Sequence, residues 1–155
     1  GLPNYPGFNL IFSAYNKNKL YKNKLYLMLL DLDYLKSIND NLDYVTGDKY
    51  IMLQASILRE IKEKVPCQIG RCGGDEMQIL FYKNASDSIN IAKKIIKSEV
   101  SRINKIEDLQ LKFSVSYGIS SCTGCTNLID AIARTDVGLR KMKFNHHKKL
   151  KEALV

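Results

Sequence analysis

The chain has 155 residues, of which 45% are hydrophobic and 26% charged, and its formal net charge is +8. This size and composition suit one compact domain with a buried core. No run approaches the roughly 18 uncharged apolar residues of a membrane span, and the first residues, GLPNYPGFNL, lack the order of a signal peptide. The basic charge alone identifies no partner, because lysines are interleaved with acids, as in REIKEK.

The first part of the chain predicts helices around one buried strand. Residues 6–15, PGFNLIFSAY, favour a short helix. The chain is then apolar from Leu25 up to Asp31, as expected of a central strand buried on both faces. In residues 46–65 apolar side chains recur every three or four positions and a proline follows, so this segment is predicted to be a helix.

The middle of the chain predicts a hairpin. Residues 67–72 and 77–83 read as two strands around a turn at residues 73–76, where glycine permits a positive φ. Two acids, Asp75 and Glu76, therefore lie at the tip of a hairpin.

The last part predicts a helix, a strand and a helix. Ser86 or Asp87 can cap a helix whose apolar stripe runs to Ile103. Residues 111–119 alternate strictly, which predicts a strand with one buried face, and residues 127–143 form the closing helix.

The order of these elements predicts an α/β (α+β) fold. Helices interspersed with strands favour a mostly antiparallel central sheet covered by helices, as in ferredoxin-like and polymerase-palm folds. Only the strand–helix–strand portion is expected to be parallel. No repeat or linker divides the chain, so residues 1–155 are predicted to form a single domain.

Two acidic clusters carry the chemistry: Asp31 with Asp33, and Asp75 with Glu76. Ionised carboxylates beside apolar sequence are costly unless a cation or donor compensates them. If the first strand lies beside the hairpin, both clusters share one edge of the sheet. Oxygen ligands from two loops are typical of a Mg²⁺ site that also binds substrate phosphates. Acids that merely cap turns are the alternative for either cluster alone.

The cysteines and histidines do not favour a second metal site. In a strand, Cys67 and Cys72 are about 16 Å apart, whereas zinc needs sulfurs at about 2.3 Å from one ion. Reduced thiols are therefore expected, with CTGC in a loop. His146 and His147 are adjacent, so they point different ways on a helix and are expected to be polar surface residues.

GGDEM, preceded by Arg71, together with DLDYLKSINDNLDYVTGDKYIMLQ, resembles the GGDEF domain of diguanylate cyclases, which condense two GTP molecules into cyclic di-GMP. The similarity covers nearly the whole chain, from GLPN through SVSYGIS to DVGLRKMK. GGDE alone is weak evidence for this family, but its place about forty residues after DLDxxKxxND makes the resemblance specific.

The resemblance implies a metal site and a catalytic group. By position, Asp31, the carbonyl of Leu32 and Asp75 would hold Mg²⁺ or Mn²⁺. Glu76 would lie beside the ribose and metal, and either Asp75 or Glu76 would act as general base for the 3′-hydroxyl. Lys36 would add a further positive charge.

The resemblance also implies substrate-binding residues. Asn39 and Asp48 would bind the guanine base, and an ionised Asp48 favours guanine over adenine because it accepts but cannot donate. Lys143 and the backbone amides near Tyr34 and Leu35 would hold the triphosphate. His147 falls where the family has an arginine that contacts phosphate, and a neutral imidazole is a poorer partner than a guanidinium.

Other positions depart from the family pattern and leave three hypotheses open. Met77 and Leu35 replace phenylalanines, and Asp43 with Tyr44 replaces Gly-His. The chain is an active diguanylate cyclase, a degenerate domain that binds GTP or a partner protein without turnover, or a related cyclase with a different cyclic dinucleotide product.

The family also implies partners. Each domain would hold one GTP, so two domains must face each other in a transient homodimer, with a sensor or dimerisation region upstream in a longer protein. A cytoplasmic location is expected, free or as the cytoplasmic part of a membrane-anchored protein, with no nucleic acid partner and no membrane contact by this domain. Lys64 and Cys67 replace the family's inhibitory RxxD, so product inhibition there is not expected.

Overall fold

The computed structural model describes residues 2–154 and contains a four-stranded sheet. Its strands are β1 (Tyr26–Leu32), β2 (Cys67–Gly73), β3 (Glu76–Phe81) and β4 (Val115–Ser121), in the order β2-β3-β1-β4. Every pairing is antiparallel. β1 and β2 run in the same direction but β3 lies between them, so the parallel pairing expected for the strand–helix–strand portion does not form.

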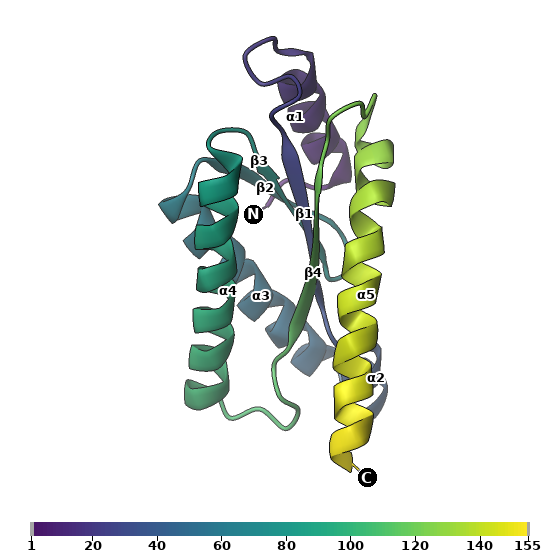
Figure 1. The fold of residues 1–155 in the computed structure, drawn as a ribbon. Coiled ribbons are helices and arrows are strands. Elements are labelled where there is room, and N and C mark those ends of the chain that lie inside the picture. Colours follow the sequence, from purple (N-terminus) through teal and green to yellow (C-terminus); the bar gives the residue numbers. More distant parts are fainter. Residues whose placement is uncertain (1, 155) are drawn as a thin grey trace.

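Helices cover both faces of this sheet (Figure 1). On one face lie α1 (Tyr5–Lys17) and α5 (Leu128–Leu154), and on the other lie α2 (Leu35–Asn41), α3 (Tyr44–Lys64) and α4 (Ala85–Ile106). The α+β fold predicted from the order of elements is confirmed.

The central strand β1 separates two hydrophobic cores. Leu27 and Leu29 face the core under α1 and α5, which contains Phe8 and Phe12, whereas Met28, Leu30 and Leu32 face the core under α3 and α4. Because successive side chains of a strand point to opposite faces, a continuous apolar run is what a strand buried on both faces requires. The prediction for this strand is confirmed, and it fixes the direction of the acids that follow.

Three predicted boundaries are wrong. The helix after the hairpin begins at Ala85 with Asn84 at its N-cap, so neither Ser86 nor Asp87 caps it. The last strand begins at Val115, not residue 111, because the Asn104 side chain accepts from Phe113 N at 2.8 Å and donates to Phe113 O at 2.9 Å. This amide takes the place of a neighbouring strand and ties the segment to α4. The last helix continues beyond residue 143 to Leu154, so the two histidines lie within it.

The hairpin has the predicted turn. Gly73 and Gly74 have φ values of 145° and 47°, a region that favours glycine. Met77 is fully buried in the core below α3, which is the environment a flexible thioether fills. All four cysteines are free thiols. No helix within residues 2–154 combines the length and apolarity needed to cross a membrane.

Candidate active site

The end of β1 and the hairpin turn meet through direct hydrogen bonds. Leu32 N donates to Asp75 Oδ2 at 3.2 Å, and Asp31 and Asp75 lie close enough to interact. From α3, Gln54 Nε2 donates to Leu30 O and to Asp75 O, each at 3.0 Å. The fully buried Gln54 therefore holds the hairpin turn against β1, a role that its place on an amphipathic helix did not reveal.

Lys143 of α5 reaches the same point. Its Nζ lies 3.0 Å from Asp31 Oδ2 and donates to Leu32 O at 3.0 Å. Two of the three predicted metal ligands thus already share one cation, supplied by a residue more than 100 positions away. The side chain of Lys143 is 30% exposed, so the ammonium group can also turn outward.

The environment of Asp31 favours binding a cation. Burial, a hydrogen bond with Asp75 and the negative charge of Asp75 raise the pKa of Asp31 to about 8, whereas Lys143 lowers it. Asp31 Oδ1 is buried and has no hydrogen-bond partner among residues 2–154. A buried oxygen without a partner costs free energy that an oxygen-seeking cation would recover.

The donor set therefore fits a hard divalent cation, with Asp31 Oδ1 as the open ligand. Within the described residues no three His, Cys, Asp or Glu side chains form a metal-binding group, and the predicted site needs only two carboxylates and a carbonyl.

A cavity of about 660 Å³ opens beside these groups. It brings together most of the predicted site residues, namely Asp31, Leu32, Tyr34, Leu35, Lys36, Asn39, Asp75, Lys143 and His147, and also contains Ser37, Asp40 and Tyr44. Two predicted residues do not line it. Asp48 is exposed on α3, and Glu76 lines a separate small cavity of about 90 Å³ instead.

Glu76 is close to other acids. Burial, followed by the charges of Asp75 and Asp136, raises its pKa, and Lys143 lowers it. A carboxyl group with a raised pKa can hold a proton nearer to neutral pH than an isolated glutamate can.

Tyr34 forms the turn between β1 and α2. Its φ of 67° is left-handed, which is uncommon for a residue with a side chain. Its hydroxyl donates to His146 O at 3.0 Å, and its ring meets His147 edge-on with ring centroids 4.7 Å apart. The C-terminal turns of α5 therefore hold this segment in place.

Asn39 faces the start of α3. Its Oδ1 is buried without a partner among the described residues, and a Cβ added to Gly47 would lie 2.0 Å from it. Gly47 is therefore needed to leave room for the Asn39 amide.

Asp33 does not join the acidic site, contrary to the expectation that it clusters with Asp31. It is 2% exposed and accepts from the hydroxyls of Ser114 and Ser116, each at 2.6 Å. His146 Nδ1 lies 2.7 Å from Asp33 Oδ2. The prediction that His146 is a polar surface residue is also wrong, because this bond holds its side chain at 26% exposure.

The fold and the cavity define a class: α+β domains in which a strand end and a glycine-rich hairpin present carboxylates beside a lysine. The family model described as "Diguanylate cyclase, GGDEF domain" matches residues 1–149, and the chain belongs to this family.

Curated relatives include two proteins of Escherichia coli. The chain is 28% identical over 124 residues to the probable diguanylate cyclase DgcI, covering 77% of this chain and 26% of the relative. It is 30% identical over 125 residues to the probable diguanylate cyclase DgcF of strain K12, covering 74% and 39% respectively. The chain thus spans well under half the length of these relatives.

Solved structures with the same fold include two bacterial GGDEF-type domains. One is the active GGEEF domain of a diguanylate cyclase from Vibrio cholerae, with a TM-score of 0.75, 23% identity, and coverage of 94% of this chain and 93% of that one. The other is the GGDEF domain of DgcB from Caulobacter crescentus in complex with c-di-GMP, with a TM-score of 0.75, 20% identity, and coverage of 93% and 86%.

Proposed function

We propose that this chain is a diguanylate cyclase that condenses two GTP molecules into cyclic di-GMP. The observation that carries the proposal is that Asp31, the Leu32 carbonyl and Asp75 lie together beside a cavity of about 660 Å³, with the Lys143 ammonium group on the first two. The family membership supports the same reaction.

A divalent cation, Mg²⁺ or Mn²⁺, would be held by Asp31, Leu32 O and Asp75. When bound, it neutralises charge on the transferring phosphoryl group and makes the attacking hydroxyl more acidic. The partnerless Asp31 Oδ1 supports this set, because a buried oxygen without a hydrogen-bond partner is stabilised by a bound cation.

The residues of the chain would position and stabilise the polyphosphate. On leaving Asp31, Lys143 would neutralise phosphate charge, and Lys36 would add a second positive charge at the cavity. The backbone near Tyr34 and Leu35, held by α5, would bind phosphate oxygens. Phosphoryl transfer needs chiefly such positioning and charge neutralisation.

Recognition of guanine is assigned to Asn39 and Asp48. The buried, partnerless Asn39 Oδ1 is an acceptor for guanine donors. Asp48 is exposed and outside the cavity, so it would contact the base only at the cavity's outer side.

The proton of the 3′-hydroxyl would go to Asp75 or to Glu76. Asp75 lines the cavity, whereas burial and the neighbouring acids raise the pKa of Glu76, which makes it a stronger base. Both residues stay candidates.

Closing two phosphodiester bonds requires two such domains, so we propose a transient homodimer in which two cavities face each other. A sensor or dimerisation region upstream would bring them together, and the reaction would take place in the cytoplasm.

A second candidate function is nucleotide binding without turnover. It is favoured by the Lys143 ammonium group, which occupies the point where the metal would bind. In that case the cavity would bind GTP but the domain would form no product.

The test is incubation of the domain at high concentration with GTP, ATP or both, with Mg²⁺ or Mn²⁺, followed by product identification by mass. Cyclic di-GMP from GTP alone supports the proposal, and Asp75→Asn should abolish it. Asp108→Asn, at an exposed position, is the matched control. GTP binding without product supports the second candidate, and turnover by Asp75→Asn contradicts the metal assignment.

A further inference from the structure

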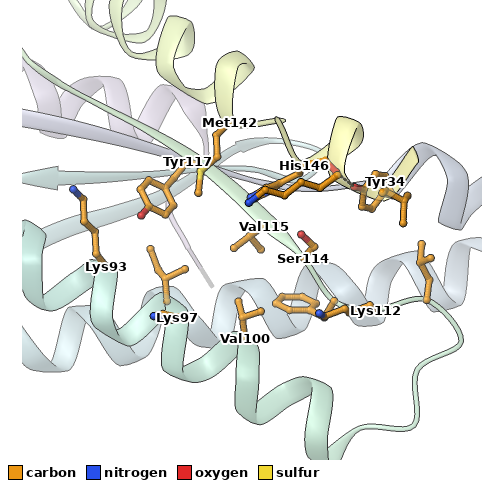
Figure 2. Close-up of a pocket in the computed structure, with 15 residues that line it drawn as sticks. Tyr34, Lys93, Lys97, Val100, Lys112, Ser114, Val115, Tyr117, Met142 and His146 are labelled. Carbon is orange, nitrogen blue, oxygen red and sulfur yellow. Dashed lines mark hydrogen bonds between the residues drawn. The ribbon is translucent and has the colours of Figure 1, made fainter. Parts of the chain in front are cut away.

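A second large groove lies along the outer edge of β4, between α4 and α5, with a volume of about 570 Å³. In Figure 2, Val115 and Tyr117 lie between Lys97 and Val100 on one side and Met142 and His146 on the other. The walls are largely apolar, with side chains that include Ile96, Val100, Phe113, Val115, Met142 and Leu150.

Four lysines surround this apolar surface: Lys93, Lys97, Lys112 and Lys149. All four are exposed, no acidic residue lines the groove, and none of the four forms an ion pair among residues 2–154. Lys93 and Lys97 are also four residues apart on α4, an arrangement in which like charges repel. The groove therefore presents uncompensated positive charge beside apolar surface.

The groove is separate from the candidate active site. Tyr34 is the one residue common to both linings. Binding in the groove therefore needs none of the carboxylates assigned to the metal and does not depend on the proposed function.

Three polar groups of the groove are already engaged, which leaves few partners for a nucleotide base. The Ser114 hydroxyl donates to Asp33, His146 Nδ1 lies against Asp33, and the Tyr34 hydroxyl donates to His146 O. A base placed here would replace few of the hydrogen bonds to water that it loses.

The backbone edge of β4 is also partly closed. Tyr117 N, which points away from β1, donates to Met142 Sδ at 3.2 Å. An added peptide strand would have to displace this side chain, so the edge is poorly suited to strand addition.

We propose that the groove binds a small amphipathic anion: a carboxylate with a medium-length alkyl chain. The chain covers the apolar walls and the carboxylate lies among the lysines. A volume of about 570 Å³ is within the range of small-molecule sites, and apolar walls with a few charged groups are their usual composition.

The experiment titrates the isotope-labelled domain with decanoate, below the concentration at which decanoate aggregates, and follows backbone amide signals by NMR. Saturable shifts are expected at Val100, Val115 and their neighbours. Hexanoate should bind at least about tenfold more weakly, because four fewer CH₂ groups are buried. Decanol should bind about fivefold more weakly, because it carries no charge for the lysines.

Two double variants separate the groove lysines from overall charge. Lys93→Glu with Lys97→Glu should weaken decanoate binding at least about fivefold. Lys94→Glu with Lys105→Glu makes the same charge change at exposed α4 positions outside the groove and should leave the affinity within about twofold.

Several results would overturn the proposal. They are the absence of saturable shifts at the groove, equal affinity for decanol and decanoate, or equal effects of the two double variants. Sedimentation in the same solutions gives the last check: if decanoate dissociates a dimer formed through this face, the occupant is a second copy of the chain.

Discussion

Lys143 Nζ and Asp31 Oδ2 are 3.0 Å apart, and the same ammonium group donates to the carbonyl of Leu32. α5 therefore delivers a positive charge to the end of the central strand.

Replacing Lys143 distinguishes its proposed contact with phosphate from its ion pair with Asp31. Lys143→Met should weaken GTP binding at least about tenfold, because a charge-assisted phosphate contact is lost. Mn²⁺ binding without nucleotide should be unchanged or tighter, because the ammonium group no longer competes for Asp31. Calorimetric titration of each ligand measures both effects.

Lys141→Met, at an exposed position of the same helix, is the control and should alter neither affinity. Unchanged GTP affinity in Lys143→Met would show that the lysine serves only the ion pair.

Replacing Asp31 should remove activity and increase the stability of the fold. Asp31→Asn is expected to abolish turnover yet raise the free energy of unfolding by about 1 kcal/mol at pH 8, after allowance for solvent screening. The reason is that burial and Asp75 raise the pKa of Asp31 from 3.8 to about 8 in the folded chain.

Proton binding to Asp31 in the folded chain causes this stability difference. Below pH 3.8 both states bind the proton and Asp31 has no effect on stability, whereas between pH 3.8 and about 8 the folded chain holds a proton that the unfolded chain releases. Wild-type stability therefore falls relative to Asp31→Asn as pH rises through this range. Thermal unfolding at a series of pH values tests this, and a stability difference that does not depend on pH would refute it.

Gly47→Ala should disturb the Asn39 amide without unfolding the chain. The added Cβ would lie 2.0 Å from Asn39 Oδ1 and must displace that side chain, whereas alanine improves helix propensity at a position within α3. We expect about tenfold weaker GTP binding, the equivalent of one lost hydrogen bond of about 1.4 kcal/mol.

ATP binding and thermal stability are the controls for Gly47→Ala. Equal losses for GTP and ATP would mean that Asn39 does not recognise guanine.

Gln54→Met should loosen the hairpin turn. The substitution keeps the side-chain volume but leaves Leu30 O and Asp75 O without the amide donor, which costs about 2 kcal/mol. Denaturant unfolding measures this loss, and a lower kcat in the folded fraction would report displacement of Asp75. Gln110→Met, at an exposed position, should have neither effect.

Much of the fold followed from local patterns, since the apolar run of β1, the glycines of the hairpin and the stripe of α4 each define their element. The errors arise where distant side chains intervene. Asn104 takes residues before Val115 away from the sheet, although their alternation is that of a strand.

The site shows the same limit. The spacing of the acids and the resemblance to a family identified Asp31 and Asp75, which the structure brings together. The contacts of His146 and Asp33 could not be predicted, because they join elements far apart in the chain. The two acceptors of Gln54 are equally distant from it in sequence. A buried glutamine on an apolar helix face is the one signal that could have indicated Gln54.

The three-residue interval between Lys143 and His146 sets both side chains toward the segment that follows β1, one at Leu32 and the other at Asp33. One inserted or deleted residue within that single helical turn would rotate one of the two by about 100°. The helical periodicity of α5, and not merely its composition, therefore places the ammonium group at the cavity and the imidazole at the end of the strand.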